Sequence, residues 1–119
     1  MTTRKLFNYE LNDSFIDIEH NENEGWINKY YISNTNIKIF CILLKHIQSY
    51  FKSNNINIYT QLVSQTDWDE FISKNNKWKI KEVQETKEIN NIITITIYCL
   101  MDNMIECIMT DLGYPPIDN

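Results

Sequence analysis

Glycine is nearly absent from this chain, since Gly25 and Gly113 are the only two among 119 residues. Loops that cradle phosphate need glycine, because the backbone must turn sharply and approach the anion closely. Two isolated glycines cannot form the G-x-G-x-x-G, G-x-x-x-x-G-K or G-x-S-x-G patterns. The sequence therefore excludes the glycine motifs of dinucleotide-binding proteins, P-loop proteins and serine hydrolases.

Cysteine, arginine and long apolar runs are also scarce. Cys41, Cys99 and Cys107 are widely spaced and form no C-x-x-C pair, and each lies in an apolar stretch, which predicts reduced, buried packing residues. No run reaches membrane-spanning length, and no apolar segment follows the first residues as in a secretory signal. We therefore expect a cytoplasmic protein in a reducing compartment. Arg4 is the only arginine, and isoleucine and asparagine are over-used, which indicates an AT-rich genome, that of a large DNA virus, a bacterium or a protist. A viral protein would act inside its host cell.

Acidic residues exceed basic ones, and the formal net charge is -5. Residues 1–59 hold six acids and six bases, whereas residues 60–119 hold ten acids and five bases. An acidic domain repels nucleic acid and anionic membranes, so we expect neither as a partner. The charge favours a basic protein as the partner.

Helical and strand-like periodicities are clear after residue 34. Apolar spacing predicts a helix over 35–52, capped by Thr35 or Asn36, and alternation predicts a strand over 56–64. A short helix is expected to begin near Thr66 and end at Asn75-Asn76. Strands over 77–85 and 91–100, joined by a turn at 85–88, are expected to form an antiparallel hairpin. A final helix is predicted between an Asp102 N-cap and Gly113.

The first 34 residues carry weaker patterns. Alternation over 7–11 and 16–18 predicts a hairpin that turns at residues 12–14. Residues 19–25 are expected to be an acidic loop, and residues 26–32 a third strand or a helical turn. Without repeats or linkers, residues 1–119 are predicted to be a single α+β domain. Its expected architecture is a two-layer sandwich, a mostly antiparallel sheet with about three helices on one face.

Several groups of chemically active residues have a sequence position that a structural role explains. Cys41 and His46 point about 140° apart on one helix, so they form no dyad. Asp67, Asp69 and Glu70 suit the first turn of a helix. The lysines of residues 77–81 suit an exposed strand face that prevents edge-to-edge aggregation. The acidic loop matches no calcium-binding spacing. We therefore predict no catalytic residue, no metal site and no cofactor.

Acidic and aromatic side chains gather between residues 17 and 31, where they could form a recognition surface. The predicted partner-binding residues are Asp17, Glu19, Glu22, Glu24, Trp26, Tyr30 and Tyr31. The first hypothesis is a small acidic, non-enzymatic interaction domain: an inhibitor, adaptor or immunity-type antidote that docks on a basic protein. The alternative is a small enzyme or ligand-binding domain, with a cleft assembled from Asp, Glu, His, Cys and Tyr residues distant in sequence. A homo-oligomeric structural component is a weaker third alternative.

Overall fold

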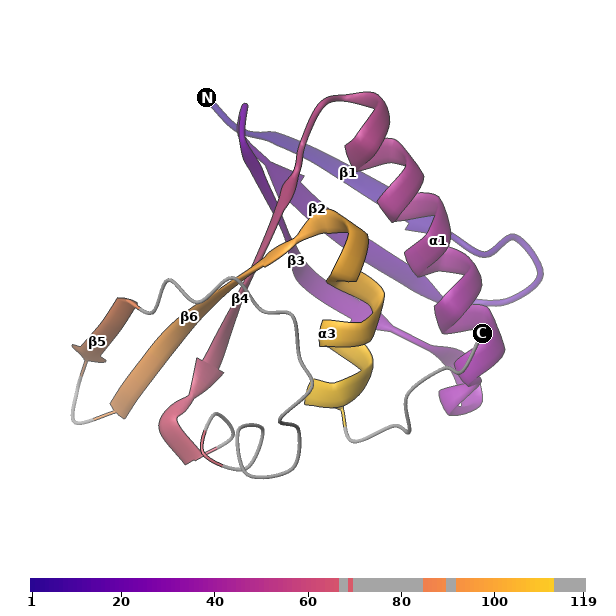
Figure 1. Ribbon diagram of the computed structural model, residues 1–119. Helices are drawn as coiled ribbons and strands as arrows, with labels where there is room; N and C mark the ends of the chain where they lie inside the picture. The colour runs from indigo at the N-terminus through magenta and orange to yellow at the C-terminus, as the bar shows by residue number, and fades with distance from the viewer. Residues whose placement is uncertain (67–68, 70–84, 90–91, 113–119) are drawn as a thin grey trace.

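The computed structural model describes residues 1–66, 69, 85–89 and 92–112 (Figure 1). Within these residues the chain forms strands, two α-helices and two short 3-10 turns, η1 and η2. In chain order they are β1 (Thr3–Asn8), β2 (Phe15–His20), β3 (Glu24–Tyr31), η1 (Ser33–Thr35), α1 (Ile37–Ser53), β4 (Ile58–Ser64), β5 (Glu85–Ile89), β6 (Ile92–Leu100), η2 (Met101–Asn103) and α3 (Met104–Asp111). The described residues thus hold two α-helices rather than the expected three or so.

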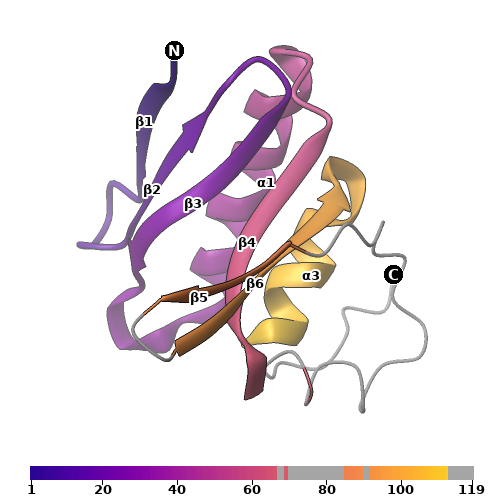
Figure 2. The same ribbon diagram turned by 90° about the vertical axis from the view of Figure 1, so that its left-hand side faces the viewer.

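One six-stranded sheet has the strand order β1-β2-β3-β4-β6-β5. All of its pairings are antiparallel except that of β3 with β4. Helices α1 and α3 lie on the same face of the sheet, which leaves the other face uncovered by the described helices (Figure 2). The core between the two layers includes Ile16, Leu44, Phe51, Ile97 and Met104, all almost fully buried. The α+β prediction with helices on one face is confirmed.

The N-terminal hairpin is confirmed, but β1 covers Thr3–Asn8, so residues 9–11 of the predicted first strand lie in the connection between β1 and β2. β1 and β2 pair from Thr3 with His20 to Asn8 with Phe15. The predicted acidic loop over 19–25 is wrong, because β2 continues to His20 and β3 begins at Glu24. The Asn21 side chain accepts hydrogen bonds from the backbone N–H groups of Asn23 and Glu24, which closes a short turn.

Helix α1 matches its prediction closely. Asn36 is the N-cap, and its side-chain oxygen accepts hydrogen bonds from the backbone N–H groups of Lys38 and Ile39. The buried face carries the helical repeat that the sequence shows. Its buried residues are Ile39, Phe40, Leu43, Leu44, Ile47 and Phe51. Two residues of the preceding turn, Asn34 and Thr35, have positive φ angles of 55° and 48°.

Strands β4 and β6 also follow their predicted ranges, and alternate residues of β6 face the core. The turn expected at 85–88 is wrong, because β5 occupies Glu85–Ile89 and pairs with β6.

The last helix begins later than expected. Asp102 lies inside the 3-10 turn η2 and forms an ion pair with Lys52, so it is not the N-cap. Asn103 holds that position without a side-chain capping bond. The predicted helix end at Gly113, the predicted strand over 77–84 and most of the predicted helix over 66–76 lie outside the described residues. No helix in the described part of the chain is long and apolar enough to cross a membrane.

Candidate functional site in the opening between β3 and β4

The parallel strands β3 and β4 pair only at their beginnings. Glu24 lies opposite Ile58 and Gly25 opposite Tyr59, and no later residues of the two strands pair. Both strands nevertheless continue, β3 to Tyr31 and β4 to Ser64. Beyond Gly25, backbone polar groups on the facing edges therefore need hydrogen-bond partners other than the opposite strand. This divergence makes an opening inside the sheet.

A β-bulge lies in β3 at the same level. Asp17 pairs with Lys29, whereas the next residue of β2, Ile18, pairs with Ile27. Asn28 is therefore an extra residue on β3. A bulge of this kind bends its strand and increases the local twist. It lies in the part of β3 that does not pair with β4.

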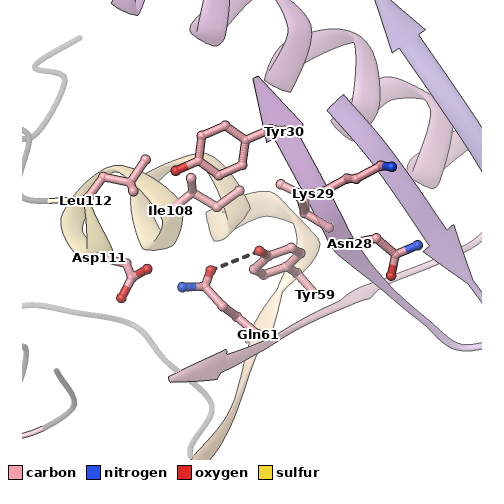
Figure 3. A pocket seen from close by; sticks show the side chains of 9 residues that line it. Asn28, Lys29, Tyr30, Tyr59, Gln61, Ile108, Asp111 and Leu112 are labelled. Atoms are coloured by element: carbon pink, nitrogen blue, oxygen red, sulfur yellow. Dashed lines mark hydrogen bonds between the residues drawn. The ribbon is translucent and has the colours of Figure 1, made fainter. Parts of the chain in front are cut away.

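On the helix side, the opening is a pocket of about 370 Å³ (Figure 3). Its lining residues are Ile27, Asn28, Lys29, Tyr30, Tyr59, Gln61, Ile108, Asp111 and Leu112. They come from β3, from β4 and from the end of α3. The polar ends of Asn28 and Lys29 point away from Tyr30, Gln61 and Asp111 in Figure 3. The polar groups gathered on the inner side are thus the tyrosine hydroxyls, the Gln61 amide and the Asp111 carboxylate.

Tyr59 and Gln61 form the polar floor of this pocket. The Tyr59 hydroxyl donates a hydrogen bond of 2.9 Å to Oε1 of Gln61, which directs the amide nitrogen of Gln61 toward Asp111 (Figure 3). Burial is the main cause that raises the pKa of Tyr59 well above 10, and Cys107 adds to it. The hydroxyl therefore keeps its proton at neutral pH, and the hydrogen bond leaves the Gln61 N–H₂ as a donor on the side of Asp111.

The opposite face of the sheet is hollowed at the same opening. Along β4 and β6, Thr60, Leu62, Thr96 and Tyr98 alternate with core residues, so they face away from the helices. They line a second pocket of about 740 Å³ together with Glu24, Trp26, Ile27, Asn28 and Gln61. Ile27, Asn28 and Gln61 line both pockets. The opening can therefore be approached from either face of the sheet.

Four predicted partner-binding residues are acidic, and the structure separates them. Asp17 is buried and accepts a 2.7 Å hydrogen bond from the Arg4 guanidinium. Glu19 is half-buried, and hydrogen bonds from Thr2 and Asn28 hold its pKa below the usual value. Glu22 is exposed in the turn between β2 and β3, and Glu24 lines the open-face pocket.

The three predicted aromatic residues also take different places. Trp26 lines the open-face pocket and donates from Nε1 to Oδ1 of Asn28 at 3.1 Å. Tyr30 is 44% exposed on the helix side, where its ring packs 5.1 Å from that of Phe40. Tyr31 is 51% exposed and lies beside Phe15. The structure thus brings Glu24 and Trp26 to one pocket and Tyr30 to the other, and partner binding by the set stays a prediction.

The remaining chemically active side chains lie elsewhere. His20 is buried against Phe51; its Nδ1–H donates to the Asn21 carbonyl, and Nε2 shares a hydrogen bond with the Tyr50 hydroxyl. Cys41 is half-buried, and burial raises its pKa, whereas Cys99 and Cys107 are buried. The hydrogen bond with Cys99 is the main cause that raises the pKa of Cys107, and burial raises it further. Among the described residues, no three His, Cys, Asp or Glu side chains lie close enough to hold a metal ion.

Sequence reasoning missed Tyr59, Gln61, Ile108 and Asp111. The first two lie on the core-facing side of a strand, and the last two end a helix, so each suits an ordinary structural role. No local pattern reports that two strands diverge. Only Tyr30 of the predicted residues lines the helix-side pocket.

Comparison with known proteins gives a likeness of fold. No protein-family model and no curated protein matches the sequence. Among solved structures, the chain is similar to a "probable acetyltransferase" from Staphylococcus epidermidis ATCC 12228, with a TM-score of 0.54 and 14% sequence identity. The match covers 82% of this chain and 67% of that one. At this identity the likeness shows that the two share a fold.

Proposed function

We propose that this chain is a small acyl-transfer domain that binds the amide-bearing arm of an acyl thioester in the opening between β3 and β4. The observation that carries the proposal is the divergence of the two strands after Gly25 and Tyr59. An extended arm with amide groups can form backbone hydrogen bonds with β3 and β4 in the part where the two strands do not pair with each other. The fold shared with the acetyltransferase-like structure supports the same reaction class.

The polar groups of the helix-side pocket suit such an arm. Gln61 is oriented by Tyr59 to donate to an amide or thioester carbonyl, and Asp111 can accept from an amide N–H. Ile108 and Leu112 cover the apolar parts of the arm. A pocket of about 370 Å³ lies within the size range of small-molecule sites.

Access from both faces suits a reaction with two substrates. With the donor on the helix side, an acceptor amine or hydroxyl can approach from the open-face pocket. The acceptor attacks the thioester carbonyl, the C–S bond breaks, and the leaving thiol takes up the proton that the acceptor loses. Glu24, which lines the open-face pocket, is the carboxylate we assign to carry that proton from the acceptor.

The test is calorimetric titration of the chain with S-acetyl-pantetheine, which carries the arm without a nucleotide. We expect saturable binding that weakens about tenfold in Gln61→Leu, because a ligand carbonyl loses its donor. Gln65→Leu is the matched control, since Gln65 is outside both pockets. Equal binding by wild type and Gln61→Leu would place the ligand elsewhere, and absence of binding would refute the proposal. Acetyl transfer to a panel of amines, lost in Glu24→Gln, is the second readout.

Protein interaction is the second candidate function, and the exposure of Tyr30 and Tyr31 favours it. Its test uses Glu22→Lys combined with Tyr31→Ala, because both side chains are exposed and the fold should tolerate both changes. A single basic protein retained from extract by wild type, released by salt and lost by the variant, would support this function. Equal retention by both chains would count against it.

A further inference from the structure

A second hollow adjoins the helix-side pocket at the start of α1. It measures about 340 Å³. Its lining residues are Tyr30, Tyr31, Ile32, Thr35, Asn36, Ile37, Phe40 and Leu112. Tyr30 and Leu112 line both hollows, so the hollow beside α1 continues the proposed arm-binding pocket. We call it the α1 groove.

The α1 groove is apolar in character. Apart from Thr35 and Asn36, the lining that the structure describes consists of aromatic and aliphatic side chains, and none of these described residues is charged. Tyr30 packs on Phe40 to form one wall, and Ile37 is 37% exposed at the first turn of α1. Burying such surface favours an uncharged apolar group as the occupant.

The adjacent helix end is not an anion site. The N–H groups at a helix start bind phosphate when they are free, but here those of Lys38 and Ile39 donate to the Asn36 side chain. Lys38 is exposed and does not line the groove. The turn before α1 contains no glycine with which the backbone could wrap a phosphate.

From this arrangement we infer that the acyl donor is amphipathic: its amide-bearing arm lies in the β3–β4 opening, and the aliphatic acyl chain on its sulfur lies in the α1 groove. The inference rests on the proposed function and names the class of donor that the same site accepts. Continuity of the two hollows and the uncharged side chains of the groove's described lining are its evidence.

The test is titration of the full chain with pantetheine thioethers that cannot react, namely the S-methyl, S-butyl and S-octyl forms. Each methylene that enters the groove should improve affinity about fourfold (~0.8 kcal/mol). We expect S-octyl to bind at least tens of times more tightly than S-methyl.

Two isoleucines of α1 provide matched variants. Ile37 lines the groove, whereas Ile42, 42% exposed on the same helix, does not. Ile37→Ser should remove most of the gain from S-methyl to S-octyl, and Ile42→Ser should keep it. Both changes are at exposed positions, and unfolding by urea will show that each variant is folded.

The outcomes separate the two claims. If no thioether binds, the proposed function fails and the inference fails with it. If S-methyl-pantetheine binds but S-octyl binds no better, the inference is wrong and the proposed function stands. If the chain dimerises in sedimentation and Ile37→Ser abolishes the dimer without any effect on S-octyl binding, a second copy covers the groove and the inference is also wrong.

Discussion

Gly25, one of the two glycines in the chain, lies where the Phe51 ring of α1 packs against β3. A Cβ built at this position would lie 2.4 Å from Cε1 of Phe51. The glycine thus lets α1 pack directly against the start of β3, where that strand pairs with β4. The sequence shows the scarcity of glycine, but the contact that requires this one depends on a phenylalanine 26 positions later.

Gly25→Ala should therefore destabilise the fold. The added methyl group must displace the Phe51 ring in a packed core, which typically costs about 1–3 kcal/mol. Urea unfolding followed by circular dichroism measures the change. The double variant Gly25→Ala, Phe51→Leu should recover part of the loss, and an unchanged midpoint in Gly25→Ala would contradict the packing account.

Tyr59 should make the stability depend on alkaline pH. Its pKa in the folded state is raised above 10, mainly by burial, so its contribution is complete below about pH 10 and is lost as pH rises further. At neutral pH, Tyr59→Phe should cost about 0.5–1.5 kcal/mol through the lost hydrogen bond to Gln61. The difference in unfolding free energy between wild type and Tyr59→Phe should shrink above pH 10. A constant difference up to pH 11 would show that the hydroxyl ionises in the folded protein.

At the scale of elements, strands and helices with a regular apolar repeat were predictable. The pattern of Ile95, Ile97 and Cys99 indicated β6, and the repeat from Phe40 to Phe51 indicated α1. The predictions failed where a contact with a residue distant in sequence, and not the local sequence pattern, determines the role of a side chain. Asp102 is a suitable capping residue, but it pairs with Lys52 of another helix.

The candidate site was less predictable than the elements that form it. Strand periodicity reports which face a residue occupies and not whether two neighbouring strands stay paired. The opening is defined by where the pairing of β3 with β4 ends, and the bulge at Asn28 is defined by the pairing of β3 with β2. Tyr30 was singled out as an aromatic residue, but its place in the helix-side pocket required the divergence of β3 and β4.

The N-cap of α1 gives a prediction at this scale. Asn36→Ala removes the acceptor for the N–H groups of Lys38 and Ile39 and should cost about 1 kcal/mol of stability. Asn36→Ser keeps a capping oxygen and should stay within a few tenths of a kcal/mol of wild type. Thermal and urea unfolding of the three chains measure this, and equal losses in both variants would show that the capping bonds contribute nothing.

At the scale of the whole molecule, the described fold is a sheet that opens in its middle, with helices on one face and an uncovered face opposite (Figure 2). The opening is where α1, α3 and both halves of the sheet meet. After Gly25 and Tyr59 the two strands do not pair with each other, so the opening between β3 and β4 is a place where a ligand can add backbone hydrogen bonds without unfolding the sheet.

Amide hydrogen exchange with and without S-acetyl-pantetheine tests this account most directly. The account predicts that the ligand slows exchange in the second half of β3, residues 27–31, and in β4 around Gln61, while β1 and the buried centre of α1 exchange as before. Slower exchange confined to another part of the chain, or no change at saturating ligand, would contradict the claim that the opening between β3 and β4 is the binding site.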